Sequence, residues 1–131
     1  MAKRRRPKAL KPPSLKEQCD ALWSACIHAR SGEKSELTGK PGPVHAHHIE
    51  RKGNYRLRYE LRNGIALTPG EHHFGVHGSD PMKWEEMITQ KIGAETRAWL
   101  RSLRSSVGGG GDLGLNRLYL QQKLEELTQK K

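Results

Sequence analysis

The segments at residues 44–49, 63–68 and 72–77 decide the fold, and they read V-H-A-H-H-I, N-G-I-A-L-T and H-H-F-G-V-H. The first two are short and apolar enough for strands, and a Pro-Gly pair then turns the chain. The third segment fits a short helix. We therefore predict two strands, joined by a basic loop at 50–62 and followed by that helix.

Histidines are concentrated in the same region, which holds six of the seven in the chain. They form two groups, H-x-H-H at 45–48 and H-H-x-x-x-H at 72–77. Neutral imidazole is the commonest protein ligand of metal ions, and on an α-helix the i, i+4 spacing puts His73 and His77 on one face. A third ligand from the strand would complete a site with three protein ligands and open positions, which is the catalytic pattern. The alternative is a set of surface histidines on a basic protein.

The segment before the strands has the pattern of an amphipathic helix. Ser14 and Glu17 form the S-x-x-E capping box of a helix start, and Gly32 marks the end. Apolar residues recur on one helical face, namely Leu15, Cys19, Leu22, Trp23, Cys26 and Ile27. The two cysteines of this face are about 10 Å apart along the axis, which is too far for a disulfide. We predict that they are small buried residues of the core.

Two helical segments and a linker are predicted after the histidines. Asp80 is a plausible helix N-cap with Pro81 at the first position, and Gly93 ends that helix. A second helical segment carries Trp99, Leu100 and Leu103. Four glycines at 108–111 are typical of a flexible linker. Residues 112–131 form an amphipathic helix that is too short to be stable alone, so it either docks on the domain or pairs with another chain.

The chain is strongly basic, and its charge is unevenly distributed. Its 131 residues include 24 Lys or Arg and 14 Asp or Glu, for a net charge of +10. Residues 1–13 contain no acidic residue and hold +6 of this charge, from Lys3, Arg4, Arg5, Arg6, Lys8 and Lys11. We predict that these residues form a disordered basic arm that contacts nucleic-acid backbone without sequence preference.

Composition limits the class of protein. Only 34% of the residues are hydrophobic, below the ~45–50% of an ordinary globular chain, so the core is small. The sequence has no run of ~18 apolar residues for a transmembrane helix and no apolar stretch of a secretory signal. We therefore expect a cytoplasmic protein with no membrane partner.

Three features together resemble the HNH nucleases, also called ββα-metal or His-Me finger nucleases. They are A-H-H-I-E at 46–50, Asn63 fifteen residues after the histidine doublet, and T-P-G-E-H-H-F-G-V-H at 68–77. The region is similar to the nuclease colicins and pyocins and to small phage-encoded HNH and NinG-like nucleases, which points to a bacterial or phage-infected cell. The resemblance covers about residues 14–105 and is strongest at 44–78.

The resemblance implies an α+β fold with a ββα-metal core, in which a two-stranded hairpin and a helix are flanked by α-helices. It implies that His48 is the general base that deprotonates the attacking water. Asn63 would fix the loop between the strands and orient that base. In a regular strand, neighbouring residues point to opposite faces, so His47 and His48 can serve one site only if the strand end is distorted.

The resemblance also implies one divalent metal ion, with His47 and His77 among its ligands. Either His72 or His73 would be another. His72 matches the family's distance from the asparagine, whereas His73 has the helical i, i+4 distance to His77. We prefer His73 and keep His72 as a nearby polar or phosphate contact. Imidazoles favour Zn²⁺ or Ni²⁺ in affinity, while Mg²⁺ and Mn²⁺ often support turnover in this family.

Phosphodiester hydrolysis suits these residue types on chemical grounds. An imidazole with a pKa of ~6.5 can take a proton from water near neutral pH, and a divalent ion stabilises charge at the phosphate. Arginine binds phosphate with two parallel hydrogen bonds. Candidate phosphate-binding residues crowd the loop between the strands, namely Arg51, Lys52, Arg56, Arg58 and Arg62. The alternative is a solvated basic loop.

The chain departs from related phage enzymes at a structural zinc site. Those enzymes often hold zinc with two C-x-x-C pairs, and the corresponding positions here are Ser35, Thr38, Thr68 and Glu71. Hydroxyls are poor zinc ligands, so we predict no structural zinc. The loop at 33–43 then depends on the helices at 15–30 and 82–104.

We predict a basic arm at 1–13, a nuclease domain at 14–107, a glycine linker at 108–111 and an amphipathic helix at 112–131. The leading hypothesis is a metal-dependent HNH-type DNA endonuclease with low or structure-directed sequence specificity. One alternative is a non-catalytic nucleic-acid-binding protein with a structural metal site. Another is an accessory subunit of phage packaging or recombination machinery, which binds a partner or itself through the last helix.

Overall fold

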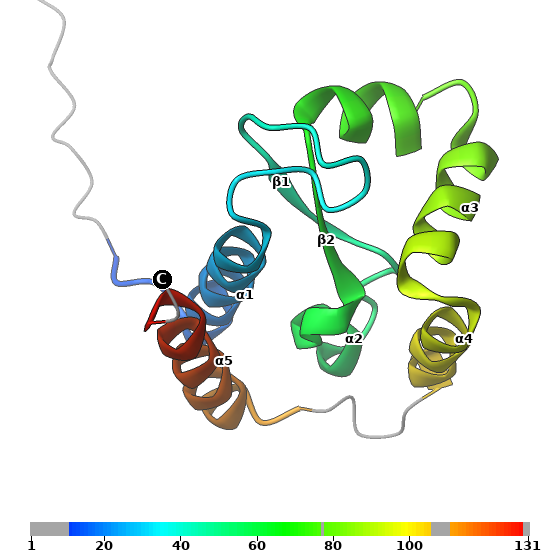
Figure 1. Ribbon diagram of the computed structural model, residues 1–131. Helices are drawn as coiled ribbons and strands as arrows, with labels where there is room; N and C mark the ends of the chain where they lie inside the picture. Colours follow the sequence, from blue (N-terminus) through cyan, green and yellow to red (C-terminus); the bar gives the residue numbers. More distant parts are fainter. Residues whose placement is uncertain (1–10, 77, 106–110, 130–131) are drawn as a thin grey trace, which may run out of the picture.

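A mixed α+β arrangement of helices around a small antiparallel sheet forms the fold (Figure 1). The computed structural model describes residues 11–76, 78–105 and 111–129. The helices are α1 (Leu15–Ser31), α2 (Tyr55–Tyr59), α3 (Pro81–Ile92), α4 (Ala94–Ser102) and α5 (Leu113–Gln129). The strands are β1 (His45–His48) and β2 (Gly64–Leu67). Three short segments complete it: the 3₁₀ turns η1 (Leu61–Asn63) and η3 (Leu103–Ser105) and the π-helical η2 (Glu71–Val76).

The two strands lie within the ranges that the sequence predicts, each shorter at its ends. They pair antiparallel, with His47 opposite Ile65 and His48 opposite Gly64. The connection between them was predicted as a loop at 50–62, and this was wrong because it contains α2 and η1. The Asn54 side chain accepts a hydrogen bond from the amide of Leu57, which starts α2, and Leu57 is buried.

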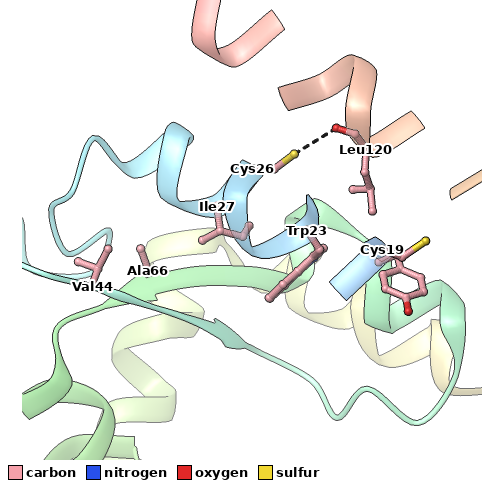
Figure 2. Close-up of a cluster of buried hydrophobic side chains, with 8 residues drawn as sticks. Cys19, Trp23, Cys26, Ile27, Val44, Ala66 and Leu120 are labelled. Carbon is pink, nitrogen blue, oxygen red and sulfur yellow. Dashed lines mark hydrogen bonds between the residues drawn. The ribbon is translucent and has the colours of Figure 1, made fainter. Parts of the chain in front are cut away.

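The sheet lies between two hydrophobic clusters, because alternate residues of a strand point to opposite faces. Ala66 packs into the first cluster with α1 and α5, while Ile65 and Leu67 pack into the second with α3 and α4. Figure 2 shows the first cluster, with Trp23 and Ile27 between α1 and the strands. At that point β2 carries a glycine for a steric reason, because a Cβ on Gly64 would lie 2.5 Å from the Ile27 side chain.

Helix α1 begins and ends where the sequence predicts. The capping box of Ser14 and Glu17 is present, and Gly32 closes the helix with a left-handed φ of 63°. On its buried face, the Cys19 thiol donates to the carbonyl of Leu113 in α5. The Cys26 thiol donates to the carbonyl of Leu120 (Figure 2). Both cysteines are buried and free, as predicted.

Cys19 contacts Leu113, and Cys26, which lies further along α1, contacts Leu120, which lies further along α5. The two helices therefore run parallel. The last predicted helix therefore docks on the domain, which was one of the two alternatives. Its leucines at this face are occupied within the chain, and Leu120 is completely buried. The apolar side chains of α5 that remain exposed are Leu115, Leu118 and Tyr119.

Helix α3 starts as predicted, with Asp80 accepting a hydrogen bond from the Lys83 amide and Pro81 in the first turn. Gly93 separates it from α4. Trp84 of α3 lies against η2, where a Cβ on Gly75 would come within 2.7 Å of its ring. This contact positions η2 beside the end of the sheet.

Several predicted segments fall at the limits of the described chain. Of the basic arm, residues 1–10 lie outside the described residues, as do 108–110 of the predicted linker. In the part that the structure describes, no helix combines the length and apolarity needed to cross a membrane.

Candidate functional site

The end of β1, the loop after it and the start of η2 enclose an open hollow of about 600 Å³. Its lining residues are Ala46, His47, His48, Arg51, Lys52, Gly53 and His72. A larger hollow of about 720 Å³ lies between the 34–39 loop, β2 and α3, and no histidine lines it. We therefore take the smaller hollow, named the histidine hollow, as the candidate site.

Two imidazoles in the histidine hollow lie at a separation that suits a shared metal ion. The ring centroids of His47 and His72 are 5.0 Å apart, with planes inclined by 63°. Two imidazoles bound to one ion through nitrogens at ~2.1 Å have centroids roughly 5 Å apart. The ring of His45 is 5.9 Å from that of His72. No group of three or more His, Cys, Asp or Glu arranged to hold a metal is found among the described residues, and His77 lies outside them.

The ring of His72 lies beside that of His47, in a type of helix that the sequence did not predict. The preference for His73 rested on α-helical i, i+4 spacing, but residues 71–76 form a π-helix. Hydrogen bonds in a π-helix run from i to i+5, so the residues that share a face differ from those of an α-helix. His73 is exposed, while His72 is partly buried against the strand. The family distance from Asn63 favours His72, and the ring of His72 lies beside that of His47.

His48 is held on both sides by neighbouring groups. Its ring stacks on the Trp23 ring with 3.8 Å between centroids and planes 1° apart. Its Nε2 lies 2.9 Å from the carbonyl oxygen of Arg58. Because a carbonyl can only accept, Nε2 carries the proton and Nδ1 carries the lone pair. Burial lowers the pKa of His48, and the hydrogen bond to Arg58 opposes this shift in part.

His47 and His48 are neighbours on β1 that contact different elements and yet line one hollow. The two rings do contact different elements, with His47 against η2 and His48 against α1. Both nevertheless line the same hollow. The hollow therefore reaches around the end of β1, where the strand stops at His48.

Asn63 fixes the backbone around His48. It is completely buried, and its side-chain oxygen accepts a hydrogen bond from the amide of Glu50. Its amide group donates to the carbonyls of Glu50 and Leu57. The hydrogen bonds to Glu50 fix the chain just after His48. The hydrogen bond to Leu57 fixes the residue before Arg58, whose carbonyl oxygen faces the His48 ring.

The five basic residues of the predicted phosphate-binding set do not all face the hollow. Arg51 and Lys52 line it. The Arg58 guanidinium instead pairs with Asp20 of α1, and Arg62 lies over the Trp99 ring, at 3.8 Å. Arg56 is exposed on α2.

The Asp20–Arg58 pair gives a prediction for acid stability. Two hydrogen bonds from Arg58 lower the pKa of Asp20 below its ordinary value, although burial opposes this. A lowered pKa stabilises the fold above about pH 4 and is lost as the pH falls below that. Because the Asp20 side chain is 37% exposed, we expect Asp20→Asn to cost only about 1 kcal/mol at pH 7. Urea denaturation should show this difference shrinking at pH 3.

A control for this pair is Glu33→Gln, since Glu33 is more exposed and pairs with His28. It should change the free energy of unfolding by less than about 0.5 kcal/mol. A cost of Asp20→Asn that is equal at pH 7 and pH 3 would contradict the prediction.

The four positions that correspond to zinc-binding cysteines in related enzymes come together as a polar knot. The Glu71 carboxylate accepts hydrogen bonds from the Thr38 hydroxyl and the Thr68 amide, and Ser35 contacts it as well. The Thr68 hydroxyl accepts from the Glu71 amide. Burial raises the pKa of Glu71, but these hydrogen bonds outweigh it, so the net shift is downward. The loop at 33–43 is thus held by this knot as well as by helices.

Sequence reasoning missed two residues of this region. Trp23 was assigned only to the apolar face of its helix, and nothing in the spacing distinguishes a residue that also stacks on His48. Glu71 was noted only as a replaced cysteine, although its pairing with two hydroxyl residues could have indicated a hydrogen-bonded substitute.

Comparisons of the chain with protein-family models, with curated proteins and with solved structures returned no match.

Proposed function

We propose that the protein is a metal-dependent DNA endonuclease of the HNH type, with a ββα-metal core formed by β1, β2 and η2. The observation that carries the proposal is the state of His48. A partly buried imidazole with its Nε2 proton engaged by a carbonyl lines the same hollow as a second and a third imidazole.

His48 has the properties of a general base. Its Nδ1 lone pair can accept a proton from water, while the Arg58 carbonyl stabilises the positive charge that develops on the ring. The water oxygen would attack phosphorus as the bond to the 3′ oxygen breaks. The 3′ oxygen leaves as an alkoxide and takes a proton from solvent, which gives 5′-phosphate and 3′-hydroxyl ends. The lowered pKa keeps His48 unprotonated at neutral pH.

His47 and His72 are the proposed metal ligands, because their separation fits a shared ion. We add His77, which lies outside the described residues, because the resemblance to the HNH nucleases implies it as a ligand. A divalent ion bound there would act as a Lewis acid at the scissile phosphate. Arg51 and Lys52 would bind the phosphate oxygens from the same hollow.

The proposal predicts metal-dependent cleavage of DNA. Supercoiled plasmid would be incubated with the protein and Mg²⁺, Mn²⁺, Ni²⁺ or Zn²⁺, and with EDTA. We expect nicked or linear product with at least one ion and none with EDTA. Isothermal titration with Zn²⁺ would test the site without activity, since His47→Ala and His72→Ala should each weaken binding at least about tenfold.

Cleavage that persists in EDTA would contradict the metal requirement. Absence of cleavage with every ion, together with a normal gel shift, would instead favour the alternative of a nucleic-acid-binding protein with a structural metal.

A further inference from the structure

We propose that Arg104 and Arg51 bind a second phosphate of the substrate, next to the phosphate that reacts at the histidines. This inference rests on the proposed nuclease function and names its substrate class. The substrate is an extended nucleic-acid strand that crosses the loop at 51–54, and a single phosphodiester does not fill the site.

A second hollow adjoins the histidine hollow. It has a volume of about 580 Å³ and is lined by Arg51, Gly53, Asn54, Leu57 and Arg104. Arg51 and Gly53 also line the histidine hollow. The two hollows therefore share a wall, and a strand whose phosphate lies at His48 can continue past Arg51 to Arg104.

Arg104 is held in place relative to the loop at 51–54. Its guanidinium contacts the buried Glu50 carboxylate at 2.9 Å. The backbone beside it is tied to the loop by a 2.9 Å hydrogen bond from the Asn54 side chain to the Leu103 carbonyl. Arg104 therefore does not need to be ordered when a ligand binds, which lowers the entropy cost of binding.

The ion pairs around Glu50 leave a surplus of positive charge. Glu50 is the shared partner of Arg97, Arg101 and Arg104, and Glu85 pairs only with Arg97 in this cluster. Three guanidinium groups against two carboxylates leave one net positive charge. Glu50 is 2% exposed whereas the Arg104 side chain is 56% exposed, so the surface of the cluster presents the cation. A guanidinium with donors left for solvent is suited to phosphate.

The test is the salt dependence of DNA binding in EDTA, which separates binding from cleavage. Binding of a fluorescent 16-base-pair duplex would be measured by anisotropy from 50 to 200 mM KCl. Arg104→Gln should lower the slope of log K against log salt by about 0.9 and weaken binding roughly eightfold at 0.1 M salt. Arg104→Lys should restore most of the slope because it keeps the charge.

The matched control is Lys123→Gln, which removes the same charge from α5, away from both hollows. It should leave the slope unchanged. If Arg104→Gln fails to fold, Arg51→Gln is compared with Lys52→Gln, because Arg51 lines both hollows whereas Lys52 lines the histidine hollow and not the second one. An Arg104→Gln slope equal to that of Lys123→Gln, or an Arg51→Gln slope no lower than that of Lys52→Gln, would overturn the inference.

The two proposals fail in different ways. Wild-type protein that cleaves plasmid while Arg104→Gln keeps the full salt slope would overturn the subsite alone. Wild-type protein that never cleaves while Arg104→Gln loses slope would support the phosphate subsite and overturn the nuclease function. Hydrolysis of bis(p-nitrophenyl) phosphate, which has one phosphodiester, should be equal in wild type and Arg104→Gln.

Discussion

Replacement of His48 by alanine is expected to lower the rate of plasmid nicking at least about a hundredfold, because general-base catalysis contributes roughly 10²–10⁴ to such rates. The substitution removes the Nδ1 lone pair that faces away from the Arg58 carbonyl. It leaves Arg51 and Lys52 in the hollow. DNA affinity in EDTA should therefore stay within about twofold of wild type. Initial nicking rates and anisotropy titrations would measure the two effects separately.

The control for this prediction is His28→Ala. His28 is a histidine of α1 that pairs with Glu33 at the surface, so its loss should leave nicking unchanged. Full nicking activity in His48→Ala would contradict the assignment of the base. An equal loss in His28→Ala and His48→Ala would show that the effect comes from the fold rather than from the chemistry.

Replacement of Glu71 by alanine is expected to destabilise the fold by about 2 kcal/mol. The carboxylate is 8% exposed and is the common acceptor of the polar knot. Its removal leaves the buried Thr68 amide without its partner, at roughly 1–3 kcal/mol, while the Thr38 hydroxyl belongs to an exposed residue and can bind water instead. Urea unfolding followed by tryptophan fluorescence would measure the loss.

Glu71→Gln is the matched variant for this prediction. The amide keeps an oxygen for the Thr68 amide and can donate to the Thr38 hydroxyl, so we expect a cost near 1 kcal/mol. If alanine and glutamine destabilise equally, the hydrogen bonds of the knot are not what holds the loop.

Elements with strong local signals were predictable from the sequence. The capping box of α1, the Asp80–Pro81 start of α3 and the glycines that end both helices all lie where the pattern predicted. These signals depend on residues within one turn of each other, so no tertiary information is needed to read them. The helix α2 was missed because its start depends on one Asn54 hydrogen bond and its burial depends on distant elements.

The candidate site was predictable in composition but not in arrangement. The sequence indicated which histidines to consider, yet the preference for His73 assumed an α-helix, whereas residues 71–76 form a π-helix. Spacing rules assume one helix type. Likewise, the stack of Trp23 on His48 joins residues 25 positions apart, and no local periodicity reports such a contact.

The parallel pairing of α1 with α5 has a consequence for the order of events during synthesis. The two cysteine contacts each join residues 94 positions apart, so a chain that has emerged only as far as α4 has an open side on α1. Contacts of such long sequence separation form late in folding. Trp23 belongs to the same cluster and stacks on His48. A nascent chain would therefore contain all of its histidines before α5 completes the cluster that holds Trp23 against His48.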